Sequence, residues 1–372
     1  MSKIAFITAA PETISAFLLA YIKELSLHHD IHIITSLKNN QAIAGLPSTI
    51  TVHHVNIHRD PKVLSDLKSL FTLYKLFKKE GYELVHSFTP KAGLLTQISA
   101  FIARIPKRLH TFTGQVWATK QGLSRGILKF LDKITATLAT FCLIDSPSQK
   151  AFLIQEKLLR DEDCKVLASG SISGVNIEKY VFSQEIRDRL RAEHKISNND
   201  FVFMFVGRMK KEKGVPELLQ AFKQINSDKN AKLFILGSDE ENLTESVNNI
   251  ANIYYLGFKS NAQEYYSFAD VLCLPSHREG FGNVIIEAAS CQLPALASNI
   301  YGLSDAVENG STGRLHQVKN VQEIASSMKT FLTDPEKLIA MRKRCRARIE
   351  ETFDERILVK EFILFYKEIG LQ

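Results

Sequence analysis

Short β-rich runs alternate with amphipathic helical stretches along the whole 372-residue chain. Thirteen such runs can be counted, each rich in β-branched, aromatic and aliphatic side chains. This alternation predicts parallel strands joined by helices that cover both faces of a sheet. Thirteen strands exceed one comfortable sheet, so we expect an α/β protein of two doubly wound, Rossmann-like domains. Ligands of such sheets bind at the carboxyl ends of the strands, and two facing sheets would make one central cleft.

The boundary between the two domains is predicted just after the sequence "GVNIEKY". A charged helical stretch, "QEIRDRLRAEHK", follows there and is expected to begin the second domain. The first domain would then span residues 1–180 and the second residues 181–352.

The composition favours a globular protein without a membrane span. Hydrophobic residues make up 45% of the chain, and no stretch approaches the roughly 20 apolar residues that a membrane helix needs. The first residues lack the uninterrupted apolar segment of a signal peptide. The five cysteines are odd in number and form no C-x-x-C pair, which is typical of reduced thiols. We therefore expect a cytoplasmic location.

The positive charge is concentrated in the first half of the chain. Residues 1–180 contain 22 Lys and Arg against 14 Asp and Glu, a balance of +8, whereas the rest contains 25 against 26. Two lysine-rich amphipathic helices, expected over residues 63–80 and 126–138, either rest on an anionic membrane surface or pack their apolar stripe on the sheet. For each helix alone packing is favoured, whereas the imbalance of the whole half favours an anionic membrane partner over nucleic acid.

Two cations and two carboxylates in a fixed order dominate the second half. "FVGRMKKEKG" supplies Arg208 and Lys213, and "HREGFGNVIIEAA" supplies Glu279 and Glu287. A buried strand is predicted over residues 271–275 and a helix after "GFGN", so Glu279 falls on the loop at the strand's carboxyl end.

The glycines beside Glu279 suit a ligand site. Gly280 and Gly282 allow the backbone to approach a ligand closely, and the N–H groups of the helix start form an anion site. Glu287 lies about one turn inside the helix, where a carboxylate suits the helix dipole and can accept two hydroxyl hydrogens, such as those of a ribose diol.

This set of motifs resembles the retaining family-four glycosyltransferases of the GT-B fold, whose signature is a Glu, seven residues and a second Glu. The resemblance covers most of the chain and is strongest after residue 201. It implies that Arg208 and Lys213 bind the donor's two phosphates and stabilise the leaving group. It also implies that Glu279 contacts hydroxyls of the donor sugar and that Glu287 holds the ribose.

Further segments carry the same resemblance. "YLGF" resembles the turn that holds the nucleobase, and "SGVN" resembles the crossing between domains. The last helix, within residues 353–372, is by this resemblance expected to return to the first domain and complete it. The remaining donor-binding candidates are Gly207, Gly257, Phe258, Gly280, Phe281, Gly282 and Asn283.

The first half matches the family less well. Its first loop reads "AAPETIS" where members often have a Gly-rich loop, which leaves Thr13 as a candidate contact for the acceptor. His110 is either the family's sugar-side histidine displaced or a core imidazole, and the core interpretation is favoured. Loop position makes Thr113, Gln115 and Trp117 candidate contacts of an acceptor sugar, with ring stacking as the role of the tryptophan.

No metal or cofactor is expected. The acidic run Asp161 to Asp163 resembles a metal–diphosphate motif but lies on an ordinary loop, and the two histidine groups near residues 30 and 55 provide no convergent ligands. The two cations would make a divalent ion unnecessary for the leaving group.

The resemblance leads to a specific functional hypothesis. We expect a hexosyl or N-acetylhexosaminyl transferase, with GalNAc as the best guess, that uses a UDP-sugar and a lipid-diphosphate-linked saccharide at the inner face of the plasma membrane. O-antigen, capsule and N-glycan assembly stay open as pathways. A nucleotide-sugar epimerase of the same architecture and a noncatalytic glycan-binding scaffold are the alternatives. A nicotinamide dehydrogenase is disfavoured because no G-x-G-x-x-G follows the first strand.

Overall fold

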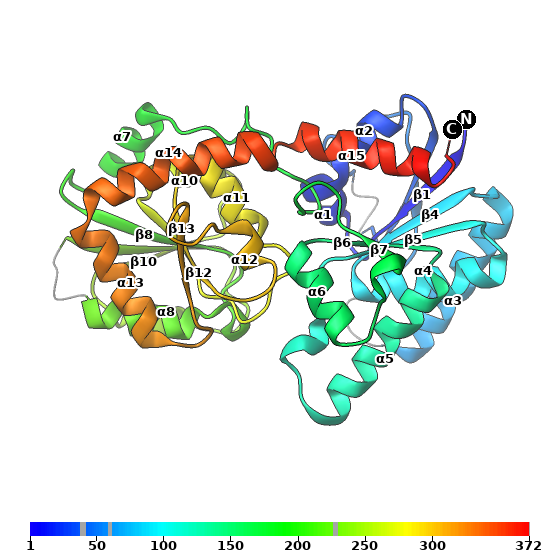
Figure 1. The fold of residues 1–372 in the computed structure, drawn as a ribbon, viewed down its shortest axis with the longest axis horizontal. Helices are drawn as coiled ribbons and strands as arrows, with labels where there is room; N and C mark the ends of the chain where they lie inside the picture. Colours follow the sequence, from blue (N-terminus) through cyan, green and yellow to red (C-terminus); the bar gives the residue numbers. More distant parts are fainter. Residues whose placement is uncertain (38–41, 59–61, 226–229, 372) are drawn as a thin grey trace. The chain divides into compact units, whose positions relative to one another are not determined.

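The protein is described by a computed structural model over residues 1–37, 42–58, 62–225 and 230–371, and it divides into two compact units (Figure 1). The first unit comprises Met1–Ser173 and Glu355–Gln372, and the second comprises Gly174–Asp354. Each unit is built on one sheet of parallel strands. The two doubly wound sheets predicted from the alternating pattern are therefore confirmed.

The first sheet has seven strands in the order β3-β2-β1-β4-β5-β6-β7. The strands are β1 (Lys3–Ile7), β2 (Asp30–Thr35), β3 (Thr51–His54), β4 (Leu84–Phe88), β5 (Lys107–Phe112), β6 (Phe141–Ile144) and β7 (Cys164–Lys165). The helices are α1 (Pro11–Thr13), α2 (Leu19–Leu25), α3 (Val63–Glu80), α4 (Pro90–Ala103), α5 (Gly122–Leu138), α6 (Pro147–Gln155) and α15 (Glu355–Glu368). Three short segments complete the unit: a π-helical turn, Ile14–Leu18, and 3-10 turns at Val116–Thr119 and Asp161–Asp163.

The second sheet has six strands in the order β10-β9-β8-β11-β12-β13. The strands are β8 (Phe201–Val206), β9 (Ala231–Leu236), β10 (Ile253–Gly257), β11 (Val271–Leu274), β12 (Ala295–Ser298) and β13 (Gly313–His316). The helices are α7 (Gln184–Glu193), α8 (Val215–Ile225), α9 (Thr244–Asn248), α10 (Ala262–Phe268), α11 (Asn283–Ser290), α12 (Leu303–Ala306), α13 (Val321–Thr333) and α14 (Pro335–Thr352). A 3-10 turn, Lys211–Lys213, precedes α8.

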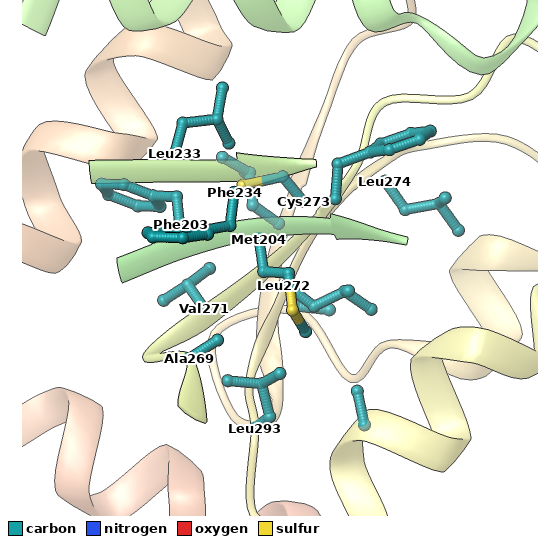
Figure 2. Close-up of a cluster of buried hydrophobic side chains, with 14 of the residues drawn as sticks. Phe203, Met204, Leu233, Phe234, Ala269, Val271, Leu272, Cys273, Leu274 and Leu293 are labelled. Carbon is teal, nitrogen blue, oxygen red and sulfur yellow. The ribbon is translucent and has the colours of Figure 1, made fainter. Parts of the chain in front are cut away.

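The core of the second unit is centred on its middle strands. Side chains of β8, β9 and β11 interlock there, as Figure 2 shows for Phe203, Phe234 and Leu272. These strands are buried on both faces, which explains why their sequences are continuous apolar runs and do not alternate. The rigid sheet fixes the positions of the loops at its carboxyl edge.

The boundary between the units lies a few residues before the predicted one. Prediction placed it after residue 180, whereas the structure places it after Ser173 and returns to the first unit at Glu355. The amide of Val175 donates to the carbonyl of Phe353 at 2.7 Å, and Tyr180 packs on the second core. These contacts assign residues 174–180 to the second unit.

The last helix, α15, packs in the first unit. The ring of Phe362 stacks on Tyr21 with 4.3 Å between centroids, and the Tyr366 hydroxyl lies 2.8 Å from Nδ1 of His86 on β4. The final helix therefore completes the core of the first unit, as the resemblance implied.

The two lysine-rich helices divide their apolar residues between core and solvent. On α3, Leu73 and Phe77 are buried against the sheet, as the packing interpretation requires, whereas Leu67 and Phe71 are each 57% exposed. On α5, Phe130 is 63% exposed. Within the described part of the chain, no helix combines the length and the apolar character needed to cross a bilayer.

A buried carboxyl group lies at the carboxyl end of β6. Asp145 is 5% exposed, and its Oδ1 atom has no hydrogen-bond partner among the residues that the structure describes. It borders a cavity of about 20 Å³ together with Thr111, Ser171 and Phe362. Burial raises the pKa of the Asp145 carboxyl from 3.8 to about 7, because the low-dielectric core disfavours the charged form.

Replacing Asp145 should make stability less sensitive to pH. A raised pKa in the folded state favours folding below pH 4, and this contribution is lost as the pH rises from about 4 to about 7. The unfolding free energy of the Asp145→Asn variant, relative to that of the wild type, should therefore be about 1 to 3 kcal/mol higher at pH 8 than at pH 5. Urea unfolding at both pH values measures this gain. Glu12→Gln, an exposed carboxylate in the same unit, is the control, and an equal gain there would contradict the assignment.

Candidate functional site

Two loops of the second unit meet where the strand order reverses. The strand β8 lies between β9 and β11, so the loops that follow β8 and β11 leave the sheet edge side by side and in opposite senses. Such a switch point is where parallel sheets bind ligands. The loop after β8 carries Arg208 and Lys213, and the loop after β11 carries Glu279, so the fold brings the predicted catalytic residues to one edge.

Lys213 and Glu279 form an ion pair between these loops. The Nζ atom of Lys213 lies 2.6 Å from Oε1 of Glu279, and both side chains are mostly buried, at 16% and 14% exposure. The hydroxyl of Ser276 donates to the same oxygen at 2.7 Å. The two residues were predicted separately from two motifs, and the structure shows them in direct contact.

Glycines allow the loops to approach this closely. Gly214 has a φ of 71°, and a Cβ there would lie 1.9 Å from the carbonyl oxygen of Pro275. Gly302 has a φ of 81°, and its Cβ would lie 2.1 Å from the carbonyl oxygen of Gly280. Backbone therefore packs directly on backbone on both sides of Glu279, and no other residue type fits these two positions.

Arg208 lies beside an acidic loop that sequence reasoning missed. Its Nη1 atom is 3.3 Å from Oε2 of Glu240, and Nζ of Lys210 is 2.7 Å from the same oxygen. Glu240 follows β9, the neighbour of β8, so the order of the strands explains the contact. The acidic run "SDEE" after a buried strand was the available signal, but only the sheet order shows which loop it meets.

The start of α11 is formed as the sequence predicted. Gly282 caps the helix with a φ of 83°, and a Cβ there would lie 2.4 Å from Cδ2 of Leu303. Asn283 is the first helical residue. Phe281 is only 2% exposed and packs edge-on against Phe353, so its ring belongs to the core, and a donor contact through its backbone stays a prediction.

Two tyrosines from outside α11, Tyr266 on α10 and Tyr180 before α7, hold the carboxylate of Glu287. The hydroxyl of Tyr266 donates to Oε2 of Glu287 at 2.9 Å, and Tyr180 also hydrogen-bonds to this carboxylate. Burial raises the pKa of the Glu287 carboxyl above its ordinary value, against the opposing effect of these hydrogen bonds. The tyrosines fix the orientation of the carboxylate. Its contact with a ribose stays a prediction.

The predicted nucleobase turn lies at the same sheet edge. Gly257 ends β10 with a φ of 68°, and its carbonyl accepts a hydrogen bond of 2.9 Å from the amide of Gly237. A Cβ at Gly237 would lie 1.9 Å from the carbonyl oxygen of Gly207, which links this turn to the loop of Arg208. The ring of Phe258 is 76% exposed and is accessible to a planar ligand.

Three of the five acceptor-side candidates in the first unit have buried side chains, and for His110 this confirms the favoured core interpretation. His110 is 1% exposed, its Nδ1 lies 2.9 Å from Oγ of Ser87, and burial lowers its pKa to about 3. It is a core imidazole. Gln115 is fully buried and accepts a hydrogen bond from Gln149 at 3.2 Å.

Trp117 is a packing residue with no ring face open to a sugar. It is 1% exposed, and its indole N–H donates to Asp132 at 2.7 Å. Phe152 stacks on the ring at 5.3 Å, and the Arg125 guanidinium lies 5.3 Å from its centroid. The sequence predicted that this tryptophan stacks on a sugar because it follows a strand. The sequence did not reveal how the ring packs.

Thr13 and Thr113 keep their predicted positions. Thr13 ends α1, the first helix after β1, and Thr113 directly follows β5; both side chains are half-buried. Their contact with an acceptor stays a prediction.

The acidic run and the histidines have local partners. Asp161 lies 2.8 Å from Nζ of Lys150, and Asp163 lies 2.8 Å from the guanidinium of Arg160. Nδ1 of His32 lies 2.9 Å from Nε2 of His53, a contact between the two groups that the sequence did not reveal. Over residues 1–37, 42–58, 62–225 and 230–371, no group of three or more His, Cys, Asp or Glu side chains is arranged to hold a metal ion.

Comparison with protein families identifies both units. Residues 3–143 match the family model described as glycosyl transferase 4-like, and residues 186–351 match the model described as glycosyl transferases group 1. The capsular polysaccharide biosynthesis glycosyltransferase CapM of Staphylococcus aureus is 34% identical over 345 residues, which cover 91% of this chain and 89% of that protein.

Two further relatives have names that state their substrates. The UDP-Gal:α-D-GlcNAc-diphosphoundecaprenol α-1,3-galactosyltransferase of Escherichia coli is 29% identical and covers 80% of this chain and 78% of its own. The N,N'-diacetylbacillosaminyl-diphospho-undecaprenol α-1,3-N-acetylgalactosaminyltransferase of Campylobacter jejuni is 23% identical and covers 99% of both chains.

Solved structures share the fold. Anabaena HepE, in complex with UDP and glucose, superposes with a TM-score of 0.82 over 100% of both chains at 20% identity. Sucrose-phosphate synthase from Thermosynechococcus elongatus superposes with a TM-score of 0.82 over 99% of both chains, also at 20% identity.

The glycine at the crossing of the two loops should be essential for stability. Gly214→Ala places a Cβ 1.9 Å from the carbonyl oxygen of Pro275 in addition to the strain of a positive φ, so we expect a loss of about 2 to 4 kcal/mol in unfolding free energy. Gly310→Ala is the matched control, because Gly310 has a φ of 85° but no atom of the described part of the chain lies within 4 Å of its Cβ position. Thermal and urea unfolding of both variants tests this, and equal losses would contradict the steric argument.

Proposed function

This chain belongs to the family-four glycosyltransferases of the GT-B fold, and we propose that it transfers a hexose or N-acetylhexosamine from a UDP-sugar to a lipid-diphosphate-linked saccharide. The proposed pathway is the assembly of a bacterial surface glycan. The observation that carries the proposal is the contact between Lys213 and Glu279 at the switch point, with Arg208 on the same loop. The cation proposed to stabilise the leaving diphosphate, Lys213, is thereby held next to the carboxylate proposed to contact the donor sugar, Glu279.

The chemistry assigned to this edge is a substitution at the anomeric carbon. The bond from that carbon to the diphosphate oxygen breaks, and a bond to an acceptor hydroxyl oxygen forms on the same face of the sugar, which retains the configuration. The departing diphosphate takes the acceptor's proton on a phosphate oxygen. Arg208 and Lys213 stabilise the charge that develops on the diphosphate, each hydrogen bond contributing about 1.5 to 3 kcal/mol.

Glu279 would then exchange partners as the donor binds. Its Oε1 atom now accepts from Lys213 and Ser276. In the proposed complex Lys213 turns toward phosphate oxygens, and Glu279 accepts hydrogen bonds from hydroxyls of the donor sugar. Glu287 accepts those of the ribose, in the orientation that Tyr266 fixes. A divalent ion is not required in this scheme, because two cationic side chains already oppose the charge.

The names of relatives narrow the substrates. A UDP donor is supported by the E. coli relative's name, and diphosphoundecaprenol acceptors by the names of both the E. coli and C. jejuni relatives. GalNAc is the first donor to test, because the C. jejuni relative transfers it. The alternatives are an epimerase of the same architecture, which would convert a UDP-sugar without an acceptor, and a scaffold, which would bind glycan and release no UDP.

Arg208 and Lys213 together form the proposed diphosphate clamp, and removing either cation should slow transfer. We expect Lys213→Ala and Arg208→Ala each to lower kcat/KM for the UDP-sugar about tenfold to a hundredfold, equivalent to about 1.4 to 2.7 kcal/mol. Release of UDP in the presence of a lipid-linked saccharide, measured with EDTA present, gives the rates. Lys223→Ala, an exposed lysine farther along α8, is the control. Unaltered rates in both site variants would remove the proposed role of the clamp.

A second part of the proposal concerns a membrane-facing surface of the first unit. Helix α4 packs beside both α3 and α5. Large apolar side chains stand exposed on all three helices: Leu64, Phe71, Phe101, Ile102, Leu123 and Phe130. The exposed lysines 68, 75, 78 and 79 of α3 and Lys133 of α5 accompany them. This combination fits an anionic bilayer, where apolar rings enter the interface and lysines meet lipid phosphates.

Binding to anionic vesicles should depend on charge and on salt. Each lysine near such a surface contributes about 1 kcal/mol, so Lys68→Glu/Lys75→Glu should weaken binding to phosphatidylglycerol vesicles by about tenfold or more. Raising the salt concentration should weaken wild-type binding through screening. Vesicle sedimentation measures both effects, with Lys329→Glu/Lys337→Glu in the second unit as the control for net charge. Equal binding by the two double variants would exclude this surface as the attachment site.

A further inference from the structure

The loop after β9 brings a carboxylate to the proposed diphosphate clamp. Glu240 contacts Arg208 at 3.3 Å and Lys210 at 2.7 Å, both through Oε2. We propose that Glu240 is a counter-ion for Arg208 that the donor's diphosphate displaces, and that it thereby weakens the site's hold on the departing nucleoside diphosphate. It is a positioning residue. The inference rests on the proposed function of Arg208 as a diphosphate ligand.

The backbone holds Glu240 in this position. The amide of Met209 donates to the carbonyl of Ser238 at 2.8 Å, and the amide of Glu240 donates back to the carbonyl of Met209 at 3.3 Å. Gly237 lies directly against the carbonyl of Gly207, where a Cβ would be 1.9 Å away. The acidic loop and the cationic loop are therefore fixed to each other, and the contact is more than a chance encounter of two long side chains.

The acidic loop is also rigid within itself. The carboxylate of Asp239 accepts hydrogen bonds from the amides of Glu241, Leu243 and Thr244 at 2.9 to 3.2 Å. The hydroxyl of Thr244 donates to the same carboxylate at 2.6 Å. Asp239 thus forms the turn that presents the next residue, Glu240, toward the clamp.

Lys210 lowers the free-energy cost of separating Arg208 from Glu240. It lies closer to the shared oxygen than Arg208 does, so Glu240 keeps a cationic partner when Arg208 turns to a phosphate. The side chains of Arg208 and Glu240 are 43% and 35% exposed, which makes their contact a weak ion pair. After the transfer step, the carboxylate repels the negative diphosphate and competes with it for Arg208. Both effects favour release of the product.

Neutralising Glu240 should tighten the binding of UDP. We expect Glu240→Gln to lower the Kd for UDP about threefold to tenfold, and we expect this difference to narrow as salt is raised from low to high concentration. Isothermal titration with UDP on the full chain, at two salt concentrations, measures it. Glu245→Gln on α9 removes the same charge from an exposed position and should leave the Kd unchanged. A merely structural role for Glu240 would give weaker binding.

The role of Lys210 is tested by a double-mutant cycle. Lys210→Met should weaken UDP binding when Glu240 is present, because Arg208 then becomes the carboxylate's remaining cationic partner, and it should have a smaller effect in the Glu240→Gln background. If Lys210→Met changed the Kd for UDP equally in both backgrounds, the idea that Arg208 and Lys210 share the Glu240 carboxylate in this way would be overturned. An unchanged or higher Kd for Glu240→Gln would overturn the inference itself.

Failure of the inference can be told apart from failure of the proposed function. If Arg208→Ala and Lys213→Ala weaken UDP binding while Glu240→Gln does not tighten it, the donor site stands and the counter-ion role falls. If neither cation affects UDP binding, the proposed donor site falls, and the counter-ion inference falls with it.

Discussion

Backbone packed directly on backbone is the constraint on which the second unit's functional edge depends. At Gly237, Gly214 and Gly302, a Cβ would lie within 2.1 Å of a backbone carbonyl oxygen on a neighbouring loop. These contacts draw together the loops that follow β8, β9, β11 and β12. Because the loops leave a rigid parallel sheet, small displacements of one would be transmitted to the others. This packing of the loop backbones determines where the charged side chains lie.

The loops bring three cationic side chains together with two carboxylates. Lys213 pairs with Glu279, and Arg208 shares Glu240 with Lys210. Cations held near opposite charges are oriented before a ligand arrives, which reduces the cost of ordering long side chains on binding. In the proposed mechanism, the cations exchange these carboxylate partners for phosphate oxygens, which suits a site that binds a diphosphate and later releases it.

The first unit is organised differently. Several of its polar and aromatic residues at the carboxyl edge, including His110, Gln115 and Trp117, face the core. Its distinguishing surface is formed by the exposed apolar and lysine side chains of α3, α4 and α5. The proposed donor site thus lies in one unit, and the surface with the exposed lysines lies in the other.

The sequence alone determined the fold class, the thirteen strands, the loops that carry Arg208, Lys213 and Glu279, and the helix that carries Glu287, because periodicity and glycine placement are local properties. It favoured a core position for His110, which the structure confirms, but it did not reveal that the side chains of Phe281, Gln115 and Trp117 are buried. Whether a side chain after a strand faces solvent or core depends on packing that no local pattern records. Only the tertiary structure decided which charges meet. Lys213 finds Glu279, and Arg208 finds Glu240, because strand order sets which loops are neighbours, and that order depends on contacts between residues far apart in the chain.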